Sequence, residues 1–290
     1  MEIGFGIDPR QQLSESDELA LVQKAAQLGY RSAWTPSGPD AAAFDRCIRW
    51  NRASGLPVGI SVVPASGQPA AFYARHALRV WEATGGDFRF GVGSGAMAKA
   101  ASEMPPYLAQ LRALMPAGPP IYVAALGPLM LRLAGEVADG VSLNWCSPER
   151  LAWSRERIQL AAAAAGRPAP VISEYIRTAV DPDPAAARSA LWQAAAGYAL
   201  GPIAYRKHFD RMGFGAELKV IEATAAEPSG GLLDAAGAHG RPGEVRAKFN
   251  RLAEGLEVAI VRVLVTEPGS LGSALRVLEE CAQTRAEHSH

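Results

Sequence analysis

The stretch of sequence that decides the fold is Pro120-Ile-Tyr-Val-Ala-Ala-Leu-Gly-Pro-Leu-Met-Leu-Arg-Leu-Ala-Gly-Glu-Val-Ala-Asp-Gly-Val-Ser-Leu-Asn-Trp145. Its first part, Ile121 to Ala125, is a short apolar run, as expected of a strand that is buried on both faces. Gly127-Pro128 follows at once, and a proline at the first helical position loses no hydrogen bond. Apolar residues then recur at helical spacing up to Asp139-Gly140, where a second apolar run begins. The stretch therefore predicts one βαβ unit.

The predicted start of this helix is also a candidate anion site. The N–H groups of the first helical turn have no partner within the helix, and Gly127 lets a ligand approach the backbone closely. Such N–H groups favour a phosphate.

Strand and helix alternate along most of the chain. Apolar runs bounded by turn residues predict eight strands, at about 3–7, 31–35, 57–63, 88–92, 120–125, 140–145, 171–180 and 257–265. Helical patterns separate or follow them at about 15–28, 40–53, 70–84, 105–115, 128–138, 148–165, 243–254 and 270–283. This count predicts an α/β fold, a (β/α)8 TIM barrel rather than an open sheet.

One interval, residues 181–242, breaks the alternation. It holds at least two further helical segments, Pro184 to Tyr198 and Ile203 to Ala226, while Ser229-Gly-Gly and 237–242 have the composition of loops. We predict that extra helices are inserted here, between strands 7 and 8, above the barrel mouth. No linker stands out, so residues 1–290 are expected to form a single domain.

Composition restricts the class of partner. The chain has 29 basic and 29 acidic residues and no basic block, which disfavours nucleic acid and acidic membranes as partners. No targeting segment or membrane span is recognisable, so we expect a cytoplasmic protein with a small-molecule substrate. The three cysteines are widely spaced without a metal-binding pattern, so no metal site is predicted and the thiols are expected to be reduced.

Reactive groups in such a barrel lie where the strands end. Asp8 follows the first strand as a candidate acid or base, with capping of the next turn as the competing role. Trp34 ends the second strand and is suited either to wall an aromatic ligand or to fill the core. Ser61 lies in the third strand, where it either touches a ligand or fills a tight space.

The fourth strand ends in Gly91-Val-Gly-Ser-Gly-Ala-Met97, whose glycines let backbone N–H groups turn toward an oxyanion. Neighbouring strands would bring this loop and Gly127 to one phosphate. Asn144, Glu174, Tyr175 and Arg177 complete the candidates, although alternation along the strand puts Glu174 on the face opposite Tyr175 and Arg177. His208 is assigned to a charged helical surface, and His288 and His290 to a frayed terminus.

These motifs resemble the bacterial luciferase-like superfamily, and within it the reductases and dehydrogenases that use the deazaflavin coenzyme F420. The most specific match is the stretch from Pro120 to Val141, which is similar to the family's fifth strand and helix. Supporting matches are Phe88-Arg-Phe-Gly-Val-Gly-Ser-Gly95 and Gly240-Arg-Pro-Gly-Glu-Val-Arg-Ala-Lys-Phe249.

The resemblance implies a flavin-type ring at the carboxyl ends of the strands and a homodimer. It also implies a cis peptide bond in the third strand, at Ser61–Val62. The cofactor phosphate would be held by the loops after strands four and five. The predicted cofactor-binding residues are Trp34, Ser61, Val62, Ser94, Gly95, Ala96, Met97, Ala125, Leu126, Gly127, Pro128 and Asn144.

One departure from the family concerns proton transfer. Deazaflavin-dependent relatives commonly read Trp-x-Pro-Asp-His after strand two, whereas this chain reads Trp34-Thr-Pro-Ser-Gly38 and lacks both ionisable groups. The candidate proton donors that remain are Asp8, Tyr175 and Glu174, in descending order.

Three functions follow as hypotheses. The first is an F420-dependent oxidoreductase that transfers hydride between the deazaflavin C5 and a C=N, C=C or C=O group of a small molecule. The second is an FMN-dependent luciferase-like monooxygenase, which would need a flavin reductase as partner. The third, motivated by the missing acidic-histidine pair, is a non-catalytic flavin- or deazaflavin-binding protein on a degenerate barrel.

Overall fold

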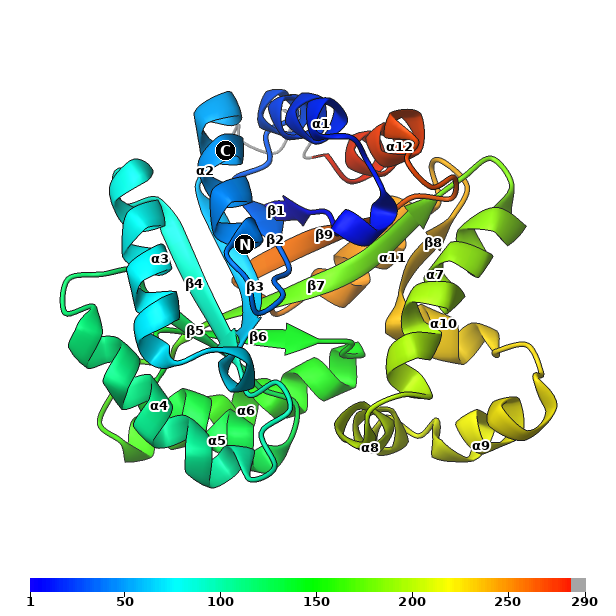
Figure 1. Cartoon of the computed structure of the whole chain (residues 1–290). Helices are drawn as coiled ribbons and strands as arrows, with labels where there is room; N and C mark the ends of the chain where they lie inside the picture. The colour runs from blue at the N-terminus through cyan, green and yellow to red at the C-terminus, as the bar shows by residue number, and fades with distance from the viewer. Residues whose placement is uncertain (283–290) are drawn as a thin grey trace, which may run out of the picture.

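The computed structural model describes residues 1–282 and contains a closed barrel of eight parallel strands (Figure 1). Hydrogen bonding runs in the order β1-β2-β3-β4-β5-β6-β7-β9, and β9 returns to pair with β1. The predicted TIM barrel is therefore confirmed. The barrel strands are β1 (Glu2–Gly6), β2 (Ala33–Thr35), β3 (Val58–Pro64), β4 (Phe88–Gly93), β5 (Ile121–Ala124), β6 (Gly140–Asn144), β7 (Val171–Val180) and β9 (Val258–Leu264).

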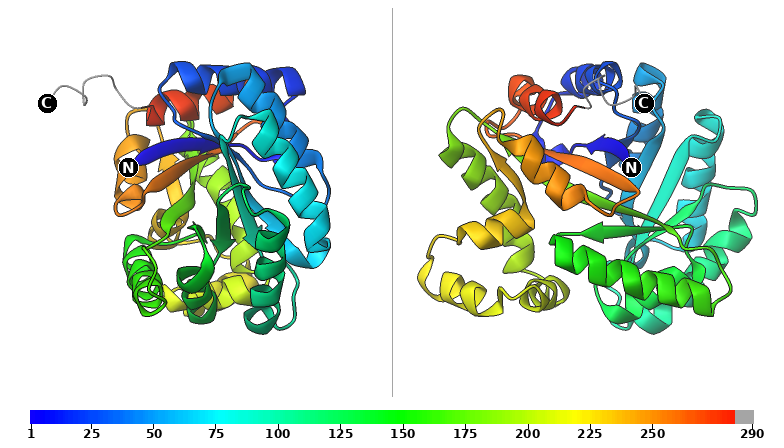
Figure 2. Two further views of the ribbon diagram at one scale, coloured as in Figure 1. Left: turned by 90° about the vertical axis from the view of Figure 1, so that its left-hand side faces the viewer. Right: turned by 180° about the vertical axis from the view of Figure 1, so that it is seen from behind.

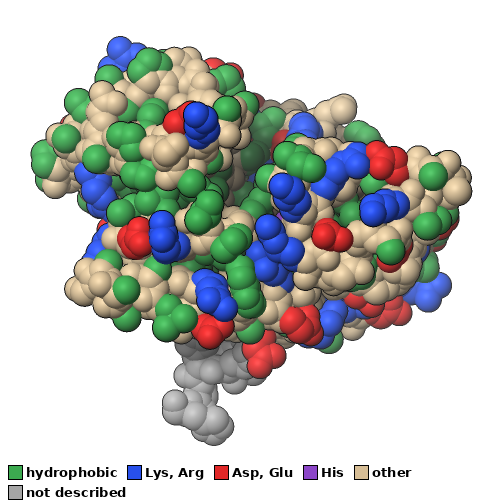
Figure 3. All heavy atoms as spheres, turned by 90° about the horizontal axis from the view of Figure 1, so that it is seen from below, with side chains coloured by type: hydrophobic (Ala, Val, Ile, Leu, Met, Phe, Trp, Pro, Cys, Tyr) green, Lys and Arg blue, Asp and Glu red, His purple; other side chains and the backbone are tan. Residues whose placement is uncertain are grey.

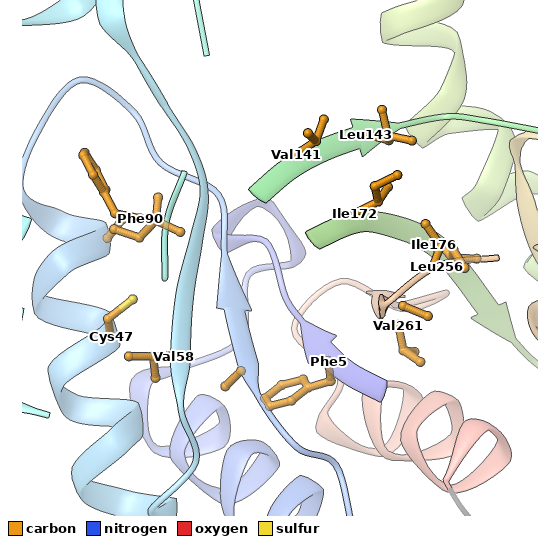
Figure 4. Packing of buried hydrophobic residues seen from close by; sticks show 14 of the residues in the cluster. Phe5, Cys47, Val58, Phe90, Val141, Leu143, Ile172, Ile176, Leu256 and Val261 are labelled. Atoms are coloured by element: carbon orange, nitrogen blue, oxygen red, sulfur yellow. The ribbon is translucent and has the colours of Figure 1, made fainter. Parts of the chain in front are cut away.

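Helices surround the barrel on its outer side (Figure 2). Apolar side chains of the strands, such as Phe5, Phe90 and Val261, are fully buried between the barrel wall and this outer layer (Figure 4). The outer helices are α1 (Glu15–Gln27), α2 (Ala42–Ser54), α3 (Ala70–Ala83), α4 (Ala100–Leu114), α5 (Pro128–Val137), α6 (Pro148–Ala164), α11 (Val245–Ala253) and α12 (Leu271–Cys281).

An additional lobe, which we call the insertion lobe, lies between β7 and α11 and stands beside the barrel (Figures 1 and 2). It consists of α7 (Pro184–Ala199), α8 (Ile203–Arg211), α9 (Gly215–Thr224), α10 (Gly230–Ala236) and the short strand β8 (Gly237–Gly240). A small apolar core of its own includes Leu191, Phe209 and Leu232, and it joins the barrel through Trp145 and Leu264.

The strand β8 explains how the lobe is attached. β6 pairs with β7 only as far as Tyr175, and β8 pairs with the next part of β7, from Arg177 to Val180. β9 pairs with the other edge of β7 over most of this length. The insertion therefore completes the hydrogen bonding of the longest strand.

Three local predictions in this interval were wrong. Residues 237–242, expected to be a loop, contain β8, and Ser229 begins α10 by accepting a hydrogen bond from the N–H of Leu232. The helix expected from Ile203 to Ala226 is broken into α8 and α9, because Gly213 adopts a φ of +93°. Short polar and glycine-rich segments gave no periodicity from which these features could be recognised.

Within residues 1–282, no helix is long and apolar enough to cross a membrane. The three cysteines, Cys47, Cys146 and Cys281, are buried free thiols. In the same part of the chain, no group of three histidine, cysteine or acidic side chains is placed to hold a metal ion.

Candidate functional site

A cleft of about 920 Å³ opens at the carboxyl ends of the barrel strands, between α5 and α8. We call it the main cleft. Seen from this side, the molecule is hollowed between two lobes, and hydrophobic side chains line the recess (Figure 3). The strand ends and their loops provide its floor and one wall, and α8 of the insertion lobe provides the opposite wall. Its size matches that of a cleft for a cofactor or a substrate.

The loop after β4 contributes four predicted residues, Ser94 to Met97, to the lining of the main cleft. Gly95 has a φ of +61°, and a Cβ atom there would lie 2.5 Å from Ser66 Oγ, so the turn requires glycine. The N–H of Ala96 already donates to Ser66 Oγ at 2.9 Å, and that of Met97 donates to the carbonyl of Ser94. These two amides are therefore engaged within the protein, which limits the anion site predicted for this loop.

The start of α5 is better suited to an anion. Gly127 precedes the helix, Pro128 occupies its first turn, and no side chain caps the free N–H groups. Arg150 fixes the loop, because its Nη2 donates to the carbonyl of Leu126 at 2.7 Å. All four predicted residues from Ala125 to Pro128 line the main cleft. Helix dipole and free amides together favour a negative charge here.

Sequence reasoning missed the contribution of α8. Ile203, Lys207 and Arg211 follow one another at intervals of four and all line the main cleft. A Cβ atom at Gly127 would have Arg211 Nη1 as its nearest neighbour, at 4.0 Å. Arg211 thus faces the start of α5 across the cleft, and Lys207 adds a second cationic side chain to the lining. The sequence predicted extra helices above the barrel mouth, but it did not predict which side chains of α8 would lie opposite Gly127.

The peptide bond Ser61–Val62 is cis, as the family resemblance implied. The pairing of β3 with β4 shifts register between Ile60 and Val63, around this bond. A Cβ atom at either Gly91 or Gly93 would lie 2.8 Å from a methyl group of Val62, so the glycines of β4 make room for this side chain. Ser61 and Val62 both line the main cleft.

Tyr175 lies at the inner end of the main cleft. Its hydroxyl is buried and has no hydrogen-bond partner among the described residues. Burial raises the pKa of this phenol well above its usual value of 10.0. The guanidinium of Arg262 lies 4.5 Å from the centre of the ring. Beside it, Asn144 Nδ2 donates to the hydroxyl of Tyr205 at 2.8 Å.

Asp8, ranked first as proton donor, lies outside the main cleft. Its Oδ1 accepts from the N–H of Arg10 at the start of the short 3-10 helix Pro9–Gln11, which is the capping role. Its Oδ2 accepts from Arg10 and Arg262. Burial alone raises the pKa of this carboxyl, but the hydrogen bonds from Arg10 and the charge of Arg262 outweigh it and lower the pKa to about 2. An acid this strong is ionised at neutral pH and has no proton to donate.

Glu174 faces away from the main cleft, as its alternation with Tyr175 requires. The side chain is buried, and its Oε1 accepts from the N–H of Cys146 at 2.6 Å. Burial raises the pKa of this carboxyl to about 8. Glu174 therefore holds a proton at neutral pH, but out of reach of a ligand in the main cleft.

Two further side chains lie elsewhere than expected. Trp34 is fully buried in the barrel interior beside Tyr122, and its Nε1 donates to Ser32 Oγ at 2.8 Å, so it fills the core rather than walling the cleft. His208, predicted to lie on a charged surface, is buried with Nε2 2.8 Å from the carbonyl of Trp145. The charged residues of α8 occupy its other faces. His288 and His290 lie outside the described residues.

The model of the family described as luciferase-like monooxygenase matches residues 98–257. A 5,10-methylenetetrahydromethanopterin reductase of Methanolobus tindarius is 44% identical over 73 residues, which are 24% of this chain and 22% of the relative. The enzyme of the same name from Archaeoglobus fulgidus is 38% identical over 77 residues, 26% of this chain and 23% of the relative. The matched segment thus spans less than a quarter of these relatives.

Solved structures resemble the chain over almost its whole length. The coenzyme F420-dependent tetrahydromethanopterin reductase from Methanopyrus kandleri has a TM-score of 0.69 at 16% identity, covering 97% of this chain and 98% of that one. An F420-dependent secondary alcohol dehydrogenase in complex with an F420–acetone adduct has a TM-score of 0.73 at 15% identity, covering 97% and 99%. The FMN complex of a 3,6-diketocamphane monooxygenase from Pseudomonas putida has a TM-score of 0.64 at 15% identity, covering 97% and 98%. At these identities the likeness establishes a shared fold.

Proposed function

The chain belongs to the luciferase-like monooxygenase family, as its motifs predicted, and from this premise we propose that it is an oxidoreductase using the deazaflavin coenzyme F420. It would transfer hydride between C5 of the deazaflavin and a C=N, C=C or C=O group of a small molecule. The observation that carries the proposal is the main cleft. It is large enough for a cofactor, and it combines an apolar floor with an anion site at the start of α5.

The residues present suit such a cofactor. Val62 and Gly93 present a largely apolar surface for a flat ring. The uncapped start of α5, together with Lys207 and Arg211 of α8, would hold the cofactor phosphate. Because Gly127 has no side chain, the space between its backbone and Arg211 is open.

A bound reduced deazaflavin supplies a hydride, and the protein must supply a proton to the substrate heteroatom. Tyr175 is the candidate donor, because it alone of the three predicted donors lines the main cleft. Its raised pKa keeps the hydroxyl protonated at neutral pH. Arg262, 4.5 Å from the ring centre, would stabilise the phenolate that remains after transfer. This arrangement would replace the acidic-histidine pair that the sequence lacks after Trp34.

Titration of the purified protein with F420 and with FMN tests the proposal. We expect F420 to bind at least about tenfold more tightly. Gly127→Val should weaken this binding by about tenfold or more, because its side chain would occupy the phosphate space beside Arg211. Gly230→Val is the matched control, since a Cβ atom there would meet no neighbouring atom and the residue lies outside the main cleft.

The outcomes separate the hypotheses. Tighter binding of FMN would replace the proposal with the monooxygenase alternative. Binding of neither cofactor would overturn both. Binding of F420 without reduction of any imine, enone or ketone in a broad panel would favour the non-catalytic alternative.

A further inference from the structure

A second cavity, of about 430 Å³, lies behind the inner end of the main cleft. We call it the arginine cavity, because Arg10, Arg177 and Arg262 line it together with a single carboxylate, that of Asp8. Trp145 and Tyr198 add aromatic walls. Tyr175 separates the arginine cavity from the main cleft. The ring of Tyr175 lines the main cleft, and the guanidinium carbons of Arg262 and Arg177 lie 4.5 and 5.8 Å from the centre of this ring.

The buried charges of this cavity do not balance. Arg262 is 4% exposed and its Nη2 pairs with Asp8 at 2.6 Å, but its Nη1 is buried without a hydrogen-bond partner among the described residues. Arg10 also pairs with Asp8, but its side chain is 72% exposed and is solvated. Asp8 can therefore neutralise one of the two buried guanidinium groups and no more.

Arg177 is the second buried guanidinium, with 5% exposure. Its Nη1 donates to the amide oxygen of Asn144 and to the carbonyl of Tyr175, which are both neutral. Its guanidinium carbon lies 3.8 Å from the centre of the Trp145 ring. Within the described part of the chain no carboxylate lies within ion-pairing distance of it. Burial lowers its pKa to about 10, which leaves it charged at neutral pH. An unpaired buried cation is costly unless an anion joins it.

We propose that the arginine cavity is the subsite for the carboxylate group of the substrate, held by Arg177 and Arg262. One monoanion matches the single excess charge of Arg177, Arg262 and Asp8, and a planar carboxylate matches the guanidinium donors. Trp145 and Tyr198 would contact an apolar or aromatic part of the substrate next to its carboxylate. The inference rests on the proposed function for the reaction itself, because it names the substrate class, which is a small carboxylic acid.

Calorimetric titration with benzoate, and with benzyl alcohol as its uncharged analogue, tests the subsite. We expect the unsubstituted protein to bind benzoate and to bind benzyl alcohol at least about tenfold more weakly. Arg177→Gln should weaken benzoate binding by about tenfold or more. Arg79→Gln is the matched control, because it removes an arginine that pairs with Asp45 on an exposed surface.

Thermal unfolding of Arg177→Gln distinguishes a ligand site from a merely structural arginine. Removal of an unpaired buried charge should leave the unfolding temperature equal or higher, whereas loss of a structural arginine would lower it. Equal affinity for benzoate and benzyl alcohol in the unsubstituted protein, or unchanged benzoate affinity in Arg177→Gln, would overturn the subsite. The comparison of benzoate with benzyl alcohol needs no variant, so it tests the subsite even if Arg177→Gln fails to fold.

The two proposals fail separately in this experiment. F420 binding without benzoate binding would overturn the subsite and leave the proposed function standing. Benzoate binding that depends on Arg177, without binding of F420, would overturn the proposed function and keep the carboxylate site.

Discussion

Asp8 Oδ2 lies 2.6 Å from Arg262 Nη2, although 254 positions separate the two residues in the chain. The contact links the loop after β1 to β9, the two strands that close the barrel. Both side chains are almost completely buried. Asp8 thus balances a buried arginine and caps a turn, which are structural tasks.

Asp8→Asn should therefore lower stability rather than only turnover. The pKa of Asp8 falls from its usual 3.8 to about 2 in the folded state, so the carboxylate stabilises the fold above pH 4 and loses this effect as the pH falls toward 2. Loss of the charge should cost on the order of 2–4 kcal/mol at pH 7. Urea unfolding of both proteins at pH 7 and pH 2.5 measures the difference. An equal difference at both pH values would contradict this account.

Tyr175→Phe should reduce turnover by about 10²–10⁴-fold, because the proton for the substrate heteroatom would be lost. F420 affinity should not change, since the ring remains in place. The fold should be as stable as before or slightly more so, because the buried hydroxyl has no partner. Steady-state rates over a panel of imines, enones and ketones, beside F420 titration, provide the measurement. Tyr122→Phe, in the same interior cluster but outside the main cleft, is the control. Equal turnover in the two variants would remove Tyr175 from the mechanism.

Glu174→Gln should stabilise the protein at alkaline pH. Burial raises the pKa of Glu174 from 4.5 to about 8, so the unfolded chain ionises first and the folded state loses relative stability as the pH rises through this interval. Glutamine keeps an oxygen to accept from the N–H of Cys146 and has no charge to bury. We expect equal stability of the two proteins near pH 4 and an advantage for the variant that grows up to about pH 8. A constant difference across pH 4–8, measured by urea unfolding, would show that Glu174 does not titrate in this way.

Arg211→Gln should weaken F420 binding by about tenfold, since one cation opposite the start of α5 would be lost. The effect should shrink at high salt, because the contribution is electrostatic. Arg206→Gln removes a cation from the same helix that pairs with Glu222 and does not line the main cleft. Fluorescence titration of both variants at low and high salt makes the comparison. If the two variants bind F420 equally, the role of Arg211 in holding the phosphate is wrong.

The sequence predicted those parts of the site that backbone geometry determines. Two glycines of the site can be recognised from the sequence. Gly95, after β4, is required by a turn, and Gly127, before α5, lets a ligand approach the backbone closely. Side-chain direction was less predictable. The three-residue strand β2 is too short for alternation to decide where Trp34 points, and Glu174 and Tyr175 could be separated by face but not assigned to one.

Individual side-chain contacts between distant segments were not predicted. The pairing of Asp8 with Arg262 and the placement of Arg211 opposite Gly127 depend on how β9 and the insertion lobe pack against the barrel. No local pattern in the sequence encodes either contact. His208 was misassigned for the same reason, because its burial depends on Trp145 from another segment.

The pairing of β8 with residues 177–180 of β7 determines which parts of the insertion lobe can be removed or replaced. Deleting residues 181–240 would leave that edge of β7 without its ladder partner and invite pairing between molecules. The tips of the lobe, α8 and α9, pair with no barrel strand, so we expect a segment grafted here from a related chain to disturb the barrel least. Replacing residues between Gly201 and Ser229, while keeping the root formed by α7, α10 and β8, should therefore change the α8 wall of the main cleft and leave the barrel intact.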